Sequence, residues 1–521
     1  MSVRTAAASA GLATLLLLTA CGGGGDGANA DGGASTLRIG IDNDQGCLDP
    51  AALDHRVLLQ WSRQIGDSLL FWDQEGKPQP WLAESYSVNK KGTEYTFELR
   101  DDVTFTDGTA LNAQVVKQNF DKLKALGADA FAAQTYLEGY KNSEVVDKYT
   151  VKVRFSAPNI PFLYGVGTPQ LAIFSGPTTK LDAEARCALG GLKGSGPFKI
   201  TNYVSMEKVE LEKNPDYQWG SAAWKNQGPA NVDNLVFNVS QNPSTRAAAA
   251  ASGDLDVVHK VAESDATLLK DAGFQNSPDP EPATSASWII NNGHGIVGTD
   301  PAVREALKIG IDREAIVATK PNIFAPATGV LNTSHPYHVD QSDELAYDPV
   351  RAKDVLEEAG WALRDDGFRY KDGQRLDIEV ITYTVGADTN MEVAQAQLKE
   401  IGINLKVTPL DANAQHARWQ ALDYDMIVTW NTSGEAAVLK SITQWTNAPE
   451  EIERRNAKQL AITDPEERQR YVADFQDYIL KNNYLIPLWQ ENVTPFWSSK
   501  VTSMTFDIAG IAAYSDVRVG E

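Results

Sequence analysis

A chain of 521 residues is too long for one hydrophobic core, and at roughly 100–200 residues per domain it predicts about three domains. Hydrophobic residues make up 42% of the chain and charged residues 22%, which argues against a disordered chain and against a membrane bundle. The 47 basic and 69 acidic residues give a net charge of −22, so the overall field argues against binding to nucleic acid or to an anionic membrane.

Residues 1–20 have the pattern of a secretory signal peptide. Arg4 is the only charge, and the small and apolar run that follows it is too short to span a bilayer. The next residue completes the letters LTAC, which end at Cys21 and resemble the lipobox of bacterial lipoproteins. In that motif the cysteine becomes the first mature residue and carries a lipid on its sulfur. An ordinary cleavage site that happens to precede a cysteine is the alternative.

Residues 21–35 are rich in glycine and predict a flexible tether, because nothing in them can form a core. A lipid followed by a tether predicts a globular body outside the cytoplasm, anchored to the bacterial cell membrane by the lipid alone. No later stretch reaches the roughly 18 apolar residues that a membrane helix needs.

The other two cysteines are Cys47 and Cys187, and three cysteines in all exclude a disulfide-dense scaffold and a cysteine-rich zinc protein. Outside the cytoplasm a pair of thiols tends to oxidise. We therefore expect a disulfide between Cys47 and Cys187 that closes a long loop. Two unrelated buried thiols are the alternative.

The first half of the body contains segments that alternate polar and apolar residues, which predicts half-buried strands. These segments are 36–41, 95–99 and 149–155. Asn112 is expected to cap a helix, because Val116, Phe120 and Leu123 follow it at helical spacing.

The second half repeats one signal for the start of a helix, an aspartate at the N-cap before a proline. The pairs are Asp300-Pro301, Asp348-Pro349 and Asp464-Pro465. The first two helices are expected to end at Gly310 and Gly360. Strand-like runs lie between the second and third helices, at 376–382, 403–407 and 424–430. Strands that alternate with helices predict an α/β lobe with a largely parallel sheet.

Residues 95–101 and 103–109, YTFELRD and VTFTDGT, resemble the signature of family 5 extracellular solute-binding proteins. These are the peptide, oligopeptide and nickel-type receptors of ABC importers. Further segments resemble the family in the same order: 194–198, 214–217, 244–257, 303–314, 347–361, 398–403 and 486–488. Most of these residues have structural roles as turns and caps, so they identify the family without marking its binding site.

The resemblance implies an α/β fold, a two-lobed periplasmic-binding-protein type II clamp with an extra N-terminal subdomain. Lobe I would take residues 36–70, 185–285 and 486–521, and the extra subdomain would take 71–184. Lobe II would take 286–485. Such a protein captures a small solute between its lobes and delivers it to membrane permease subunits, and we expect it to act as a monomer.

Three segments are expected to line the ligand cleft, by their position in the family. The residues are Asp42, Asn43, Asp44 and Gln45 after the first strand, Trp288, Asn291 and Asn292 at the entry to lobe II, and Trp430, Asn431, Thr432 and Ser433 at a strand end of lobe II. Trp430 is the strongest candidate, since an aromatic ring among small polar residues is typical of a binding platform. For each tryptophan, packing in the core is the alternative.

Ser433 departs from the family. Peptide-binding members have an aspartate at this position, which holds the ammonium group of the ligand. A hydroxyl gives a weaker interaction than a charged acceptor. A free peptide amine is therefore a doubtful ligand unless Glu435 or Asp44 substitutes.

The sequence gives little sign of a metal, a cofactor or a catalytic reaction. His335 and His338 form an H-x-x-H pair with no third ligand nearby, which is a weak metal signal. No nucleophile elbow, P-loop or H-E-x-x-H motif is present. We expect no resident metal or cofactor and no enzymatic activity. A receptor for nickel chelates, haem or siderophores, a signalling receptor and a secreted lipoprotein enzyme are the alternatives.

Overall fold

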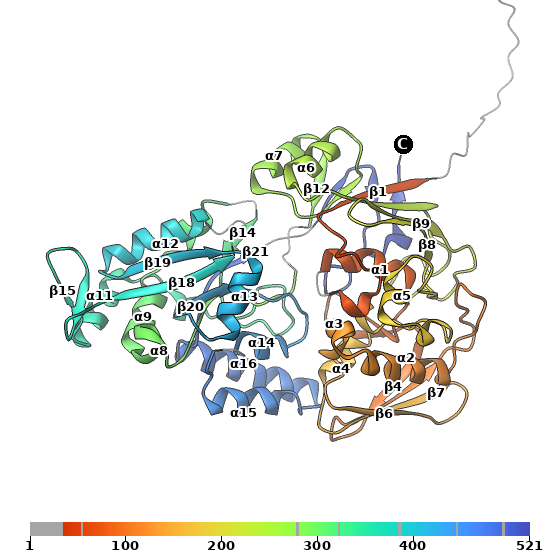
Figure 1. Ribbon diagram of the computed structural model, residues 1–521, viewed down its shortest axis with the longest axis horizontal. Helices are drawn as coiled ribbons and strands as arrows, with labels where there is room; N and C mark the ends of the chain where they lie inside the picture. Colours follow the sequence, from red (N-terminus) through yellow and green to blue (C-terminus); the bar gives the residue numbers. More distant parts are fainter. Residues whose placement is uncertain are drawn as a thin grey trace, which may run out of the picture. The chain divides into compact units, whose positions relative to one another are not determined.

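The computed structural model describes residues 35–53, 56–277, 281–320, 323–383, 388–443, 446–491 and 495–520. The expected signal peptide, Cys21 and all of the expected tether except Ser35 lie outside these residues. The described chain forms two large mixed sheets, a four-stranded antiparallel sheet and shorter hairpins, with helices packed against the sheets (Figure 1). Among the helices of these segments, none combines the length and the apolar character that a membrane span requires.

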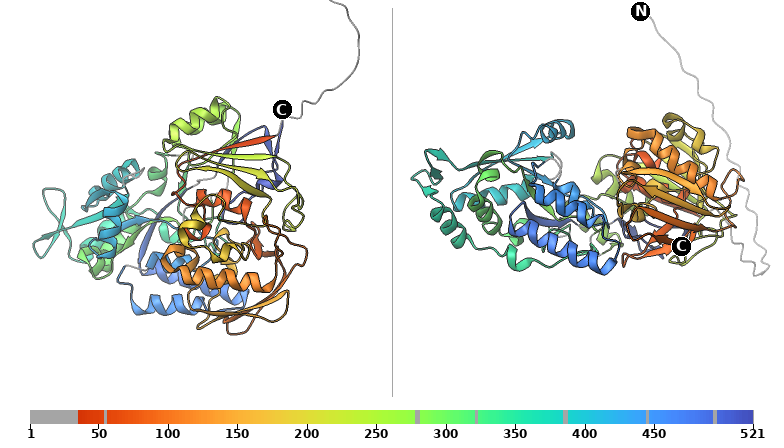
Figure 2. Two further views of the ribbon diagram at one scale, coloured as in Figure 1. Left: turned by 45° about the vertical axis from the view of Figure 1, so that its right-hand side comes forward. Right: turned by 90° about the horizontal axis from the view of Figure 1, so that it is seen from below.

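The first sheet joins strands from the beginning, the middle and the end of the chain (Figure 2). Its order is β12 (Phe274–Asn276), β22 (Phe496–Ser498), β11 (Val257–Val258), β1 (Thr36–Ile41), β10 (Asn234–Val239), β9 (Lys208–Lys213) and β8 (Phe198–Val204). The predicted first strand is confirmed by β1, in which Leu37, Ile39 and Ile41 are fully buried. β1 runs parallel to both of its neighbours, β10 and β11.

The smaller antiparallel sheet belongs to the segment expected to form the extra subdomain. Its order is β4 (Ala83–Val88), β5 (Glu94–Leu99), β7 (Thr150–Phe155) and β6 (Tyr140–Val145). Helix α2 (Ala113–Leu126) packs on β6 and β7. The Asn112 side chain accepts a hydrogen bond from the backbone N–H of Val115, and Val116, Phe120 and Leu123 are buried. The predicted cap and apolar face of this helix are therefore confirmed.

The second sheet is mixed, so the expectation of a largely parallel sheet is wrong. Its order is β14 (Phe324–Pro326), β21 (Leu485–Glu491), β13 (Ala286–Ile290), β20 (Met426–Thr429), β18 (Asp377–Tyr383) and β19 (Asn404–Leu410). β18 runs parallel to β19 and β20, whereas β13 runs antiparallel to both β20 and β21. A strand–helix alternation predicts parallel pairing only where a crossover helix joins the strands, as α12 (Asp388–Glu400) joins β18 to β19.

Three helices of the second half begin where the Asp-Pro pairs predict. They are α9 (Pro301–Ile309), α11 (Pro349–Glu358) and α16 (Pro465–Lys481). Each aspartate accepts a backbone hydrogen bond from the first turn of its helix. The other helices are α1 (Leu59–Ile65), α3 (Phe131–Gln134), α4 (Pro161–Gly165), α5 (Ala183–Cys187), α6 (Pro243–Ala251), α7 (Glu263–Asp271), α8 (Gly295–Thr299), α10 (Arg313–Val317), α13 (Ala412–Gln420), α14 (Val438–Thr443) and α15 (Glu450–Gln459). The short strands are β2 (Leu70–Trp72), β3 (Pro78–Pro80), β15 (Ala362–Leu363), β16 (Arg369–Lys371), β17 (Gln374–Arg375), β23 (Val501–Thr502) and β24 (Arg518–Val519).

The C-terminal boundary expected for lobe I, residue 486, falls inside β21. β21 lies between β13 and β14 in the second sheet, and the chain returns to the first sheet only at β22. The apolar run from Leu485 to Leu488 is buried in the second sheet, which explains its composition.

Cys47 and Cys187 form a disulfide. Beside it, the buried Arg186 donates a hydrogen bond from Nη2 to Oδ1 of Asp49, at 2.9 Å. The disulfide and the ion pair together fix the loop after β1 to the C-terminal end of α5.

Candidate functional site

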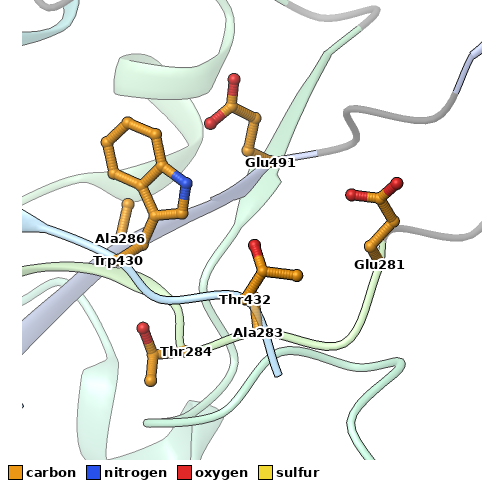
Figure 3. A pocket seen from close by; sticks show the side chains of 7 residues that line it. All are labelled: Glu281, Ala283, Thr284, Ala286, Trp430, Thr432 and Glu491. Atoms are coloured by element: carbon orange, nitrogen blue, oxygen red, sulfur yellow. The ribbon is translucent and has the colours of Figure 1, made fainter. Parts of the chain in front are cut away.

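A pocket lies at the edge of the second sheet where β13 begins and β20 and β21 end. Its lining comes from the residues before and at the start of β13, the residues after β20 and the last residue of β21 (Figure 3). Because β13 runs antiparallel to both neighbours, these three chain ends meet at one edge. The lining residues are Glu281, Ala283, Thr284, Ala286, Trp430, Thr432 and Glu491.

Backbone pairing continues beyond β20 and holds the 430–433 segment extended. The N–H of Thr284 donates to the carbonyl of Asn431 at 2.9 Å, and the N–H of Ser433 donates to the carbonyl of Pro282 at 3.0 Å. Successive side chains of an extended segment point to opposite faces. Trp430 and Thr432 accordingly line the pocket, whereas Asn431 and Ser433 do not.

Trp430 lines the pocket and is partly exposed. The residue is 43% exposed, whereas most of the large aromatic residues in the described part of the chain are buried. Ser433 is engaged elsewhere, since its hydroxyl accepts a hydrogen bond from the N–H of Glu435 at 3.1 Å. The role of Trp430 as a ligand platform stays a prediction that this placement supports.

Two acidic residues of the pocket, Glu281 and Glu491, were missed by the sequence reasoning. Glu281 is 7% exposed and forms an ion pair with Arg56. Burial lowers the pKa of Arg56 to about 10. Glu491 is half-buried, and burial raises the pKa of its carboxyl group, against the attraction of Lys260 and Lys320. Glu491 ends an apolar strand, LIPLWQE, and a charged residue in that position was the one available signal.

The structure does not support the prediction that Trp288 and Asn291, at the entry to lobe II, contact ligand. Trp288 is fully buried in the core of the second sheet. Asn291 is also fully buried, and its amide donates to the carbonyls of Leu422 and Tyr424 at 2.9 and 3.0 Å. Asn292 follows the end of β13 that lies opposite to the pocket, and its side-chain amide donates a hydrogen bond to the carbonyl of Thr446. All five residues of β13 are buried, because it is a central strand covered on both faces.

The loop after β1 does not line the pocket either. Asp44 is fully buried and accepts hydrogen bonds from the N–H groups of Gly46 and Met206, at 2.9 and 2.7 Å, a placement that does not support its expected contact with ligand. Asn43 accepts from the N–H of Gln45, which is exposed. Asp42 forms an ion pair with Lys260 at 3.3 Å.

Neither proposed substitute for the aspartate of the family is available. Asp44 is committed to its turn. Glu435 is buried and forms an ion pair with Arg468, which is also buried. A cationic group of a ligand would therefore have to be held by other residues.

A second cavity of about 350 Å³ shares Glu281 with the pocket. This volume lies in the range of small-molecule sites, about 300–1,000 Å³. Its lining combines residues that flank the first sheet with residues of the second half of the chain. The other lining residues are Gln74, Ser277, Pro282, Thr333, Ser334, Pro495, Phe506, Asp507, Ile508 and Gly510.

The H-x-x-H histidines have structural partners. Nδ1 of His335 accepts from the N–H of Tyr337 at 3.1 Å, and burial lowers the pKa of His335 to about 3. Nδ1 of His338 lies 2.9 Å from the carbonyl of Leu331. Within the described ranges, no group of three or more His, Cys, Asp or Glu side chains could hold a metal ion.

Solved structures share this architecture. NikA from Brucella suis, in complex with Fe(III)-EDTA, superposes with a TM-score of 0.80 at 23% identity, over 93% of this chain and 99% of that chain. A dipeptide-binding protein from Pseudoalteromonas sp. SM9913, in complex with Met-Leu, superposes with a TM-score of 0.74 at 20% identity, over 93% of this chain and 100% of that chain. The predicted α/β fold with an extra subdomain is confirmed, and the structure shows that its two main sheets are mixed and that the extra subdomain is antiparallel.

The chain belongs to the bacterial extracellular solute-binding proteins, family 5 Middle, whose model matches residues 77–449. The glutathione-binding protein GsiB of Salmonella typhi is 28% identical over 510 residues, which cover 92% of this chain and 95% of that protein. The family consists of binding proteins for transport rather than enzymes, which agrees with the prediction that the chain has no catalytic activity.

Proposed function

We propose that this chain is the substrate-binding lipoprotein of an ABC importer, which captures a small peptide-like or other organic solute and delivers it to permease subunits in the membrane. The observation that carries the proposal is the position of the pocket. Both connections between the large sheets reach it, because Glu281 lies between β12 and β13 and Glu491 ends the strand before β22. A ligand that contacts both connections can couple its binding to rotation of the lobes.

The relatives support a small solute as the ligand. GsiB is named for glutathione, and the Pseudoalteromonas protein was solved with a dipeptide. The cavity of about 350 Å³, which shares Glu281 with the pocket, has room for a solute of this size.

Calorimetric titration and thermal melting of the soluble domain test the proposal. The probes are glutathione, Met-Leu and a small-molecule ultrafiltrate of yeast extract. We expect saturable stabilisation by at least one probe, since a ligand at 100 times its Kd adds about 2.7 kcal/mol. Mass spectrometry should recover the bound compound unchanged. Turnover of a compound without saturable stabilisation would identify an enzyme and overturn the proposal.

The lipid anchor is part of the same proposal, and it rests on the LTAC sequence and the glycine-rich segment after it. Cys21→Ser should move the protein from the membrane fraction to the soluble fraction, because one acyl-bearing cysteine is the expected attachment. Immunoblots of fractionated cells measure the change. A variant that still sediments with membranes would show that another anchor exists.

A further inference from the structure

Glu491 carries a charge that the surrounding side chains leave without a close partner. In the described parts of the chain, its carboxyl group has neither a hydrogen bond nor an ion pair within 4.0 Å. The nearest cations are engaged elsewhere: Arg56 pairs with Glu281, Lys260 pairs with Asp42, and Lys320 packs over the ring of Phe324 at 5.4 Å. A half-buried carboxylate without a partner is costly, so a cation bound beside it would be stabilised.

Trp430 supplies a second feature that suits a cation. Trp430 and Glu491 line the same pocket, and Figure 3 shows their side chains with those of Thr432 and Glu281 around it. The face of an indole ring attracts a positive charge within about 6 Å. None of the seven lining residues is basic, so no side chain of the lining competes for either group.

We propose that the pocket binds the positively charged amine of the ligand, with Glu491 as its counter-ion and Trp430 as its aromatic wall. This inference rests on the proposed function and names the chemical class of the solute. In this proposal the amine is bound at the end of β21 and not at position 433, where this chain has a serine.

An amine fits better than an anionic or neutral group at this end of the ligand. A carboxylate or phosphate would meet the charges of both Glu281 and Glu491, and only Glu281 is neutralised by a close cation. A neutral hydroxyl would leave the charge of Glu491 without compensation, whereas an ammonium forms a charge-assisted hydrogen bond with it.

The test divides a yeast-extract ultrafiltrate on a strong cation-exchange resin at acidic pH. The retained fraction contains compounds with an amine or another cationic group, and the flow-through contains the rest. Both fractions are returned to neutral pH and added in dilution series to the soluble domain, whose melting is followed. We expect stabilisation by the retained fraction alone.

Variants connect the result to the pocket. Glu491→Gln keeps the shape of the side chain and removes its charge, and it should raise the concentration of the retained fraction needed for half-maximal stabilisation by about tenfold or more. Glu344→Gln removes the same charge from an exposed site away from the pocket and should leave the titration unchanged. The melting temperature of each variant without additions shows whether it folds.

Each remaining outcome has a distinct meaning. Stabilisation by the flow-through alone, or an unchanged titration of Glu491→Gln by the retained fraction, would overturn the amine site while the protein remained a solute receptor. An absence of stabilisation by either fraction and by the undivided ultrafiltrate would overturn the proposed function together with the amine site.

Discussion

The hydroxyl oxygen of Tyr164 accepts a hydrogen bond from the backbone N–H of Gly434 at 3.2 Å. Tyr164 lies in α4 of the extra subdomain, and Gly434 follows the pocket segment that contains Trp430 and Thr432. Both residues are buried. This bond therefore ties the pocket-forming segment of the second half of the chain directly to a helix of the first half.

Tyr164→Phe removes the acceptor and leaves the N–H of Gly434 buried without a partner, which costs about 1–3 kcal/mol. If the bond is made when the lobes close on a ligand, the cost should appear mainly as weaker binding, about tenfold. Calorimetric titration of the stabilising solute measures it. Tyr140→Phe is the control, because the Tyr140 hydroxyl bonds only to Asp121 and Ser143 inside the subdomain. Equal affinity losses in both variants would contradict a specific role for Tyr164.

Trp430→Ala should weaken ligand binding by roughly tenfold while changing the melting temperature of the free protein only slightly, because the indole is 43% exposed. Trp288→Ala provides the contrast, since loss of a fully buried tryptophan costs about 3–5 kcal/mol of stability. Titration and melting of both variants distinguish the roles. A large loss of stability in Trp430→Ala with unchanged affinity would place that ring in the core.

The raised pKa of Asp67 predicts how the stability of the protein depends on pH. Burial raises the pKa of this fully buried carboxyl group from 3.8 to about 7, although Ser195 and Trp219 donate hydrogen bonds to it. The native state therefore holds the proton more tightly than the unfolded state does. The resulting stabilisation is complete below pH 3.8 and is lost as the pH rises through about 7.

Asp67→Asn should remove this dependence. The difference in unfolding free energy between the parent protein and the variant should change by a few kcal/mol between about pH 4 and pH 8, with the parent losing stability as the pH rises. Denaturant titrations at several pH values measure it. The difference is the informative quantity, because the pKa of the buried His259 is lowered to about 3 and its contribution has the opposite sign. A constant difference across this range would contradict the shifted pKa.

The disulfide gives a fourth prediction. Cys47 and Cys187 are separated by 140 residues, and removal of a native disulfide typically costs about 2–5 kcal/mol. The double variant Cys47→Ser, Cys187→Ser should lose stability in this range, as measured by denaturant unfolding. Thiol titration of the soluble domain, denatured without reductant, should detect no free thiol. Detection of two reactive thiols would rule out the disulfide.

Local patterns predicted the elements well, because caps and alternation depend on neighbours in the chain. The N-cap aspartates of α9, α11 and α16, and the buried face of β1, follow directly from short spacings. The topology of the second sheet was harder to predict, since the direction of β13 relative to its neighbours depends on which distant strands flank it. Sheet membership of β21 was missed for the same reason.

The candidate site shows the same limit. Trp288 and Trp430 are both tryptophans in or beside strands, and only the packing of the sheet separates the buried ring from the exposed one. Glu281 and Glu491 lie far apart in the sequence and line one pocket because β13, which follows Glu281, pairs with β21, which Glu491 ends. A single sequence contains the residues of such a site but does not show which strands pair and bring those residues together.

The late position of β21 and β22 in the chain has a consequence for export. Each large sheet contains an internal strand from the last part of the sequence, since β21 lies between β14 and β13 and β22 lies between β12 and β11. Neither sheet can close while those residues are still on the ribosome, although domains otherwise tend to fold as the chain emerges. A nascent chain in this state keeps both large sheets incomplete until synthesis ends, which is compatible with the export of an extracytoplasmic protein before it folds.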